Sequence, residues 1–235
     1  MSAPSSSRES LSERLAHGQH SWSGTVEHFI DLAELLARCH EQGQAVPLLE
    51  PTRVLLEDGV PAVLVGLQPR ALPQTTKEVP LKEATLEDSS VRSDPLLGAV
   101  NLSELDPQQR AYIAPERLVG LPNSELAEQF SFCAMLYEAL YDAPPVDYSM
   151  RTSNDLPVLA PASFPTRMDV PRALVPVLRR GLAIQPSERW PDMRTLLEQL
   201  RAAAQTSRHQ RTRLVLAASA LGLVVLLSAL ALALT

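Results

Sequence analysis

An uncharged apolar run constrains the fold of this chain more than any other feature. Residues Leu214–Leu234 are all Leu, Val, Ala, Gly or Ser. A helix rises about 1.5 Å per residue, so this run would span roughly 30 Å, the thickness of the hydrocarbon core of a bilayer. A helix of a soluble core rarely extends this far without a polar face. The run therefore predicts a transmembrane helix over 214–234.

The charges beside the run predict its orientation. Arg208, Arg211 and Arg213 precede it, whereas Thr235 alone follows it. Because positively charged flanks stay on the cytoplasmic side of a membrane, we expect a single-pass protein whose N-terminal domain is cytoplasmic. The polar start of the chain, Met1–Ser10, lacks the apolar stretch of a signal peptide.

The composition limits the partners and the chemistry of the remaining residues. A net charge of −6 argues against a nucleic-acid partner, since such proteins carry a basic surface. Cys39 and Cys133 fall in apolar helical patterns, and in the cytoplasm we expect them to be reduced core residues. The histidines and cysteines lack the spacing of a metal site, so none is predicted.

Periodicity predicts two long helices and one small hairpin. Thr25–Gln42 and Glu125–Tyr141 carry apolar residues at i, i+3 and i+4, and Gly43 is placed to end the first helix as its C′ residue. Two short β-prone runs, Thr52–Leu56 and Ala62–Leu67, flank a Glu-Asp-Gly turn signal. The pattern indicates a mainly α domain.

The rest of the domain has weaker signals. Residues 68–109 are rich in Pro and charge without a sustained period, which predicts a long loop. A helix is expected from Pro171 to Ala183, capped by Asp169, and a last helix from about Pro191. The predicted organisation is a disordered leader over 1–9, a domain over 10–201, a basic linker over 202–213 and the transmembrane helix over 214–234.

Three blocks, in this order, resemble the C-terminal lobe of bacterial-type Ser/Thr protein kinases. The Ala-Pro-Glu sequence that contains Pro115 and Glu116 looks like the end of an activation segment. Glu128 opens a helix similar to the large central helix of the family, where members usually have Asp. Arg189, within Pro-Ser-Glu-Arg-Trp, resembles the late arginine of that lobe. The resemblance covers about residues 10–201 and implies a helical lobe with one small β-hairpin, in which Glu116 and Arg189 form a buried ion pair.

The segment after Gly43 keeps the length of a kinase catalytic loop but lacks its chemistry. Leu48 stands at the place of the catalytic Asp, Arg53 at that of the metal-binding Asn, and Val65 at about that of the metal-binding Asp. Leucine cannot accept a proton from a hydroxyl group, and arginine cannot ligate magnesium. The other degenerate positions of the loop are Val46, Pro47 and Glu50. The resemblance therefore implies a pseudokinase without catalytic, cofactor or metal residues.

The upper lobe of a kinase is also expected to be missing. No Gly-rich loop occurs, and both lysines, Lys77 and Lys82, follow the metal-Asp position, so neither can bind nucleotide there. A C-terminal lobe alone would expose the face that normally meets the upper lobe. Val46, Leu48 and Val65 are expected on that face, and exposed apolar patches usually mark interaction sites. We therefore expect a protein partner or a second copy of the chain to bind there.

The predicted function is a binding or scaffold module without phosphoryl-transfer activity, anchored in a bacterial inner membrane. Two alternatives stay open. The first is a membrane-bound Ser/Thr kinase that uses ATP and magnesium, with an N-terminal lobe missing from this chain. The second is a tail-anchored helical adaptor unrelated to kinases, which a large separation between Glu116 and Arg189 would favour.

Overall fold

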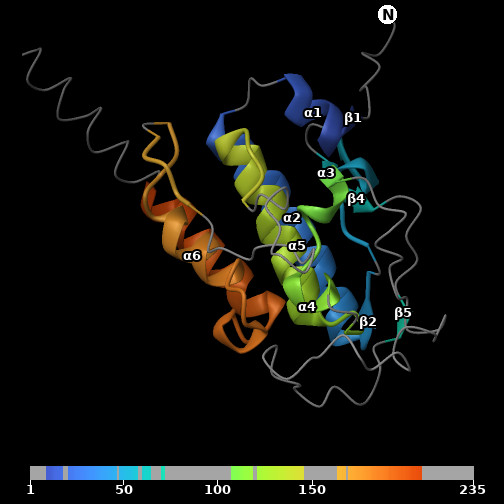
Figure 1. Cartoon of the computed structure of the whole chain (residues 1–235). Coiled ribbons are helices and arrows are strands. Elements are labelled where there is room, and N and C mark those ends of the chain that lie inside the picture. The colour runs from blue at the N-terminus through green and yellow to red at the C-terminus, as the bar shows by residue number, and fades with distance from the viewer. Residues whose placement is uncertain are drawn as a thin grey trace, which may run out of the picture.

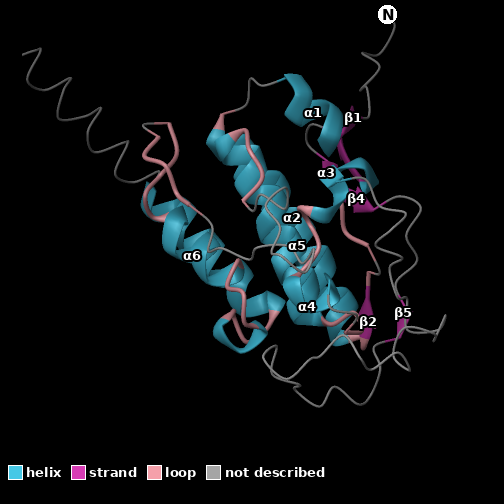
Figure 2. Cartoon of the chain, viewed as in Figure 1, coloured by secondary structure: helices cyan, strands magenta, loops and turns pink. Residues whose placement is uncertain are grey.

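The computed structural model of the chain is mainly helical (Figures 1 and 2). It describes the following residues: 9–17, 21–46, 48–57, 60–64, 70–71, 107–118, 121–145, 163–167 and 169–207. Within these ranges no helix combines the length and the apolar character that crossing a membrane requires. The predicted span 214–234 lies outside them, as do the basic residues that precede it and the degenerate positions Pro47 and Val65.

Two long helices, α2 (Trp22–Glu41) and α5 (Glu125–Tyr141), form the centre of the fold and lie against each other in Figure 1. The prediction for α5 is confirmed to the residue. α2 begins earlier than predicted because the Ser21 hydroxyl accepts a hydrogen bond from the Gly24 amide at 3.3 Å and caps the helix. Gly43 follows with a φ of 67°, which confirms its predicted place at the C-terminal end of α2.

The core is the apolar seam between these helices. Phe29 of α2 and Phe132 of α5 meet edge to face with ring centroids 5.4 Å apart, and both are almost fully buried. A last helix over 193–207 adds a third layer through a buried apolar stripe: Met193, Leu196, Leu197, Leu200, Ala203 and Ala204. The stripe follows the helical period and explains why this helix packs with one face inward.

The predicted hairpin is present, and it belongs to a three-stranded sheet. β3 (Val54–Glu57) and β4 (Val60–Leu64) pair antiparallel, with an irregularity in the register between Leu55 and Glu57. β1 (Glu9–Ser10) pairs with β3 on the other side, so Glu9 is not part of a disordered leader as predicted. Further short elements are α1 (Leu11–His17), β2 (Gln44–Ala45), which pairs with β5 (Arg70–Ala71), η1 (Pro51–Arg53), α3 (Pro107–Arg110) and α4 (Pro115–Leu118).

The C-terminal elements differ from the prediction at their ends. α6 (Leu174–Gly181) starts later than predicted and is not capped by Asp169, whose carboxylate pairs with Arg167 at 2.7 Å instead. A 3-10 turn, η4 (Pro186–Glu188), leads to the last helix. That helix continues to 207, so the predicted linker is helical over 202–207. The predicted loop over 68–109 likewise contains β5 and the first part of α3.

Candidate functional site

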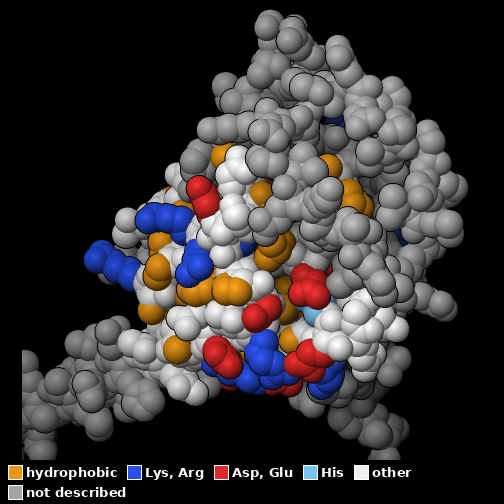
Figure 3. All heavy atoms as spheres, turned by 90° about the horizontal axis from the view of Figure 1, so that it is seen from below, with side chains coloured by type: hydrophobic (Ala, Val, Ile, Leu, Met, Phe, Trp, Pro, Cys, Tyr) orange, Lys and Arg blue, Asp and Glu red, His pale blue; other side chains and the backbone are white. Residues whose placement is uncertain are grey.

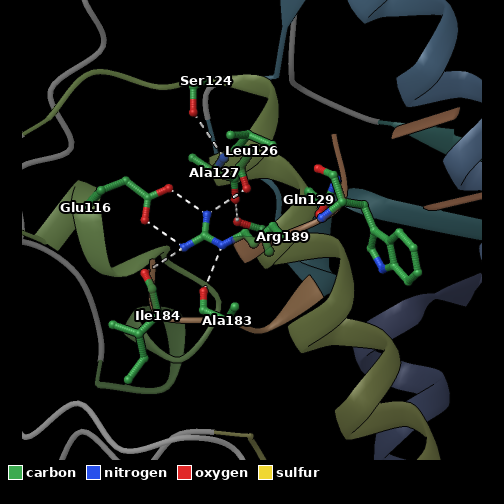
Figure 4. A network of polar contacts seen from close by, with 10 residues as sticks. Glu116, Ser124, Leu126, Ala127, Gln129, Ala183, Ile184 and Arg189 are labelled. Carbon is green, nitrogen blue, oxygen red and sulfur yellow. Dashed lines mark hydrogen bonds and ion pairs between the residues drawn. The ribbon is translucent and has the colours of Figure 1, made fainter. Parts of the chain in front are cut away.

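A buried ion pair joins two segments that are far apart in the sequence. Arg189 follows η4, and Glu116 lies in α4. The two nitrogens Nη1 and Nη2 of Arg189 donate to Oε1 and Oε2 of Glu116 at 2.6 and 2.8 Å (Figure 4). The side chains are 0% and 5% exposed, so this bidentate pair is shielded from water. The contact that the resemblance implied between these residues is present.

The remaining donors of Arg189 bind backbone carbonyls. Nη1 also donates to the carbonyl of Leu126 at 2.8 Å, Nη2 to that of Ile184 at 3.3 Å, and Nε to that of Ala183 at 2.9 Å (Figure 4). A guanidinium group has five N–H donors, and all five are used here. The group also lies 5.1 Å from the centre of the Phe130 ring. Arg189 therefore ties α4, the start of α5 and its own loop into one unit.

A second buried carboxylate, Glu128, holds the loop that follows α2. Its Oε2 lies 2.9 Å from Nε2 of His40, at the end of α2. Its Oε1 accepts hydrogen bonds from the amide of Val46 and, at 3.0 Å, from Nδ2 of Asn123. Asn123 also donates to the carbonyl of Val46 at 3.0 Å. Burial raises the pKa of Glu128, and the donors from His40, Val46 and Asn123 act in the opposite direction.

One of the three residues predicted on an exposed apolar face is buried. Val46 is 1% exposed and belongs to the core, so its placement on an exposed face is wrong. Its backbone is held by Glu128, which turns the side chain into the protein. Leu48 is partly exposed and stays available for contact. Pro47 and Val65 lie outside the described residues.

Glu50 is the polar centre of this loop. It is 4% exposed, and its Oε1 accepts from the Thr52 hydroxyl at 3.0 Å and from Nε of Arg53 at 2.8 Å. Its Oε2 accepts from Nε2 of Gln109, in α3, at 2.9 Å. Both oxygens are thus engaged, and the positive charge beside the carboxylate is that of Arg53.

These residues do not fit magnesium or a nucleotide. Arg53, which the resemblance places at the position of a metal ligand, brings a positive charge, and Leu48 has no atom that can ligate a metal. In the ranges that the structure describes, no group of three or more His, Cys, Asp or Glu could hold a metal ion. We therefore derive no phosphoryl-transfer step from this loop.

A small cavity lies between the loop and the central helix. Its volume is about 10 Å³, and its lining includes Leu48, Arg117, Asn123, Glu128 and Ser131. This space holds about one water molecule and is far too small for a nucleotide. Burial lowers the pKa of Arg117, and the nearby carboxylates of Glu116 and Glu128 act against that shift.

Sequence reasoning missed two side-chain partners of Glu128. His40 was interpreted as an ordinary helix residue, and Asn123 was not considered. Their common partner, Glu128, lies 88 positions from His40 and five positions from Asn123. The resemblance had singled out Glu128, but nothing in the sequence marked His40 and Asn123 as its partners.

Known proteins do not assign the chain to a family, because no protein-family model matches it and no curated protein matches it. The function must therefore be argued from the contacts of the chain itself.

Proposed function

We propose that this chain is a membrane-anchored binding or scaffold module, built on a degenerate kinase-like C-terminal lobe and without phosphoryl-transfer activity. The observation that carries this proposal is the bidentate pair between Glu116 and Arg189. Two surface charges with no common role would not be buried together with all five guanidinium donors bound. The pair also removes the support that a large separation between these residues would have given to the adaptor alternative.

The chemistry of the loop supports a role without catalysis. Phosphoryl transfer needs a carboxylate that accepts the hydroxyl proton and oxygen ligands for magnesium. Leu48 supplies neither, and Arg53 places a cation 2.8 Å from the carboxylate of Glu50. Magnesium bound beside this guanidinium group would be repelled by it.

The proposed partner surface lies around Leu48. This side chain is partly exposed and borders the cavity beside Arg117. With Val46 buried, the surface is smaller than the apolar face that the sequence suggested. A protein partner or a second copy of the chain remains the proposed occupant, and the membrane anchor remains the proposed transmembrane helix over 214–234.

A nucleotide titration tests the absence of a nucleotide-binding site, which catalysis would require. The full chain in detergent is heated with increasing concentrations of ATP and magnesium, and we expect no change in Tm. A ligand at 100 times its Kd stabilises a protein by about 2.7 kcal/mol, which raises Tm by roughly 5–11 °C for a domain of this size. A shift of that size would contradict the proposal and favour the kinase alternative.

Site-specific crosslinking tests the partner surface. A photoreactive residue replaces Leu48 in the full chain, and a matched variant carries it at Gln199, an exposed position of the last helix. In membranes we expect a protein adduct from position 48 and none from position 199. Equal labelling at both positions, or none at either, would speak against a binding surface around Leu48.

A further inference from the structure

The last described helix lies antiparallel along α2. Arg194 pairs with Glu41, with Nε and Oε1 2.9 Å apart, and one heptad later Arg201 pairs with Glu34. Residue numbers therefore increase along the last helix in the direction in which they decrease along α2. Such exposed pairs contribute little to stability, and the buried stripe of helix 193–207 is what holds it in place. The ion pairs report the register of the two helices.

This register identifies the end of the lobe that lies nearest to the proposed anchor. Residue 207 is level with about residue 28 of α2, so the start of α2 at Trp22 extends roughly 9 Å beyond it. The apolar run begins at Leu214. The residues between 207 and 214 can span at most about 25 Å in any conformation. The tether therefore keeps residue 207, and the end of the lobe that contains Trp22, within reach of the bilayer.

Aromatic side chains gather at this same end. α5 runs from its contact with the end of α2, where Glu128 meets His40, toward the start of α2 (Figure 1). Its last residue, Tyr141, packs with Tyr137 and Phe164 at centroid distances of 4.6 and 6.0 Å. Trp22 and Phe164 are only partly buried, and Pro144 and Pro165 nearby in the chain are exposed.

The charges at this end are compatible with a lipid surface. Arg167 bonds to the carboxylates of both Asp142 and Asp169, so its positive charge offsets one of their two negative charges, and the guanidinium of Arg179 lies close to the same end. The Arg179 guanidinium lies 5.3 Å from the centre of the Phe164 ring. Tryptophan and other aromatic residues are enriched where a protein meets the headgroup region, and arginine is attracted to anionic lipids.

We infer that the aromatic end of the lobe, defined by Trp22, Pro144, Phe164 and Pro165, rests on the surface of an anionic membrane. The inference depends on the proposed anchor over 214–234. The opposite end then faces the aqueous phase, since α2 has 20 residues and is about 30 Å long. That end carries Leu48, and Figure 3 shows acidic and basic side chains next to one another on the face seen from below.

The two tryptophans of the chain provide a direct test. Trp22 lies at the aromatic end, and Trp190 follows Arg189 at the start of the last helix, about 25 Å from residue 207. The full chain is inserted into vesicles of phosphatidylethanolamine and phosphatidylglycerol that contain headgroup nitroxide lipids. In Trp190→Phe, which keeps Trp22, we expect at least threefold stronger quenching than in Trp22→Phe. Equal quenching, or stronger quenching of Trp190, would overturn the inference.

A second measurement avoids changes to partly buried residues. A photoreactive residue is placed at Pro144 or, as a matched exposed control, at Ser187 in η4. We expect lipid adducts from position 144 only, and adducts from 187 alone or from both would refute the orientation. If the chain fails to float with the vesicles, the anchor itself is wrong and the inference falls with it. A chain that floats without preferential labelling would refute the orientation alone.

Discussion

Replacing Glu116 by Gln is the sharpest perturbation of the fold that the structure offers. The change keeps the shape of the side chain and removes the negative charge that lies 2.6 and 2.8 Å from the guanidinium nitrogens of Arg189. The arginine side chain is 0% exposed, so water cannot solvate its charge when the carboxylate is removed. Breaking a buried ion pair in this way costs about 3–5 kcal/mol. For a domain of this size each kcal/mol lowers Tm by about 2–4 °C, so we expect a fall of roughly 6–20 °C.

An exposed ion pair supplies the matched control. Arg194→Gln also removes one charge from an arginine–glutamate pair, but the side chains of Arg194 and Glu41 are 56% and 53% exposed. Water replaces the lost contact there, and we expect no measurable change in Tm. A second comparison uses Glu116→Met, Arg189→Met and the double variant. The double variant should lose less stability than the two single variants together, because neither charge is left alone.

Tryptophan fluorescence is a suitable assay for this unfolding. The Trp190 indole is adjacent to Arg189 and donates a hydrogen bond to the carbonyl of Val177 at 3.2 Å. Thermal unfolding of the full chain in detergent therefore reports on the part of the lobe that the pair holds together. If Glu116→Gln lowers Tm no more than Arg194→Gln does, the pair does not carry the stability that we assign to it.

Three further predictions concern buried groups. In Gly181→Ala the new Cβ would lie 2.2 Å from Sγ of Cys133, so the free energy of unfolding measured in urea should fall by about 1–3 kcal/mol. Adding Cys133→Ala should restore part of this loss. In the control Gly24→Ala the nearest contact of the new Cβ is at 3.5 Å, and no such loss is expected. Burial raises the pKa of the Cys39 and Cys133 thiols, so a thiol reagent at pH 8 should modify neither until the protein unfolds; rapid modification of the native chain would contradict this. Burial also raises the pKa of Glu128 above its ordinary value of 4.5, so its contribution to stability is present below that pH and is lost as the pH rises. Glutamine does not ionise, so the Tm of Glu128→Gln minus the Tm of the wild type should increase as the pH is raised from 4.5 to 8. A difference in Tm that does not change with pH would refute the assignment.

Local patterns predicted the elements that are long enough to show a period. α5 is bounded as its apolar spacing indicates, and the hairpin of β3 and β4 surrounds its turn signal. β1 and β2 have two residues each, too few to show alternation, and β1 pairs with β3 across more than 40 residues of chain. The start of α6 was misplaced because Asp169 had a competing partner: it pairs with Arg167 instead of capping the helix.

A contact in the candidate site could be predicted where the resemblance identified both of the residues that form it. Glu116 and Arg189 were paired in advance on the resemblance, and they are in contact. Val46 was placed wrongly because the prediction considered only its side chain. Its backbone amide is bound by Glu128, so the direction of the side chain is set by a residue 82 positions away. Glu50 was identified only as a departure from the kinase pattern, although three side chains converge on it.

Buried polar residues and the residues of the loop after α2 differ in what they contribute to the fold. Arg189 and Glu128 bind backbone groups and other buried charges, and losing either one would leave several partners without a hydrogen bond. On the proposed relationship, Leu48 stands, partly exposed, at the position of a catalytic carboxylate, and a carboxylate there would be partly solvated and would contribute little to stability. On the proposed relationship, catalytic residues could therefore be lost at little cost to the fold, whereas the buried carboxylates could not. That difference is consistent with the proposed binding module, which would need the internal contacts of the lobe and not its catalytic groups.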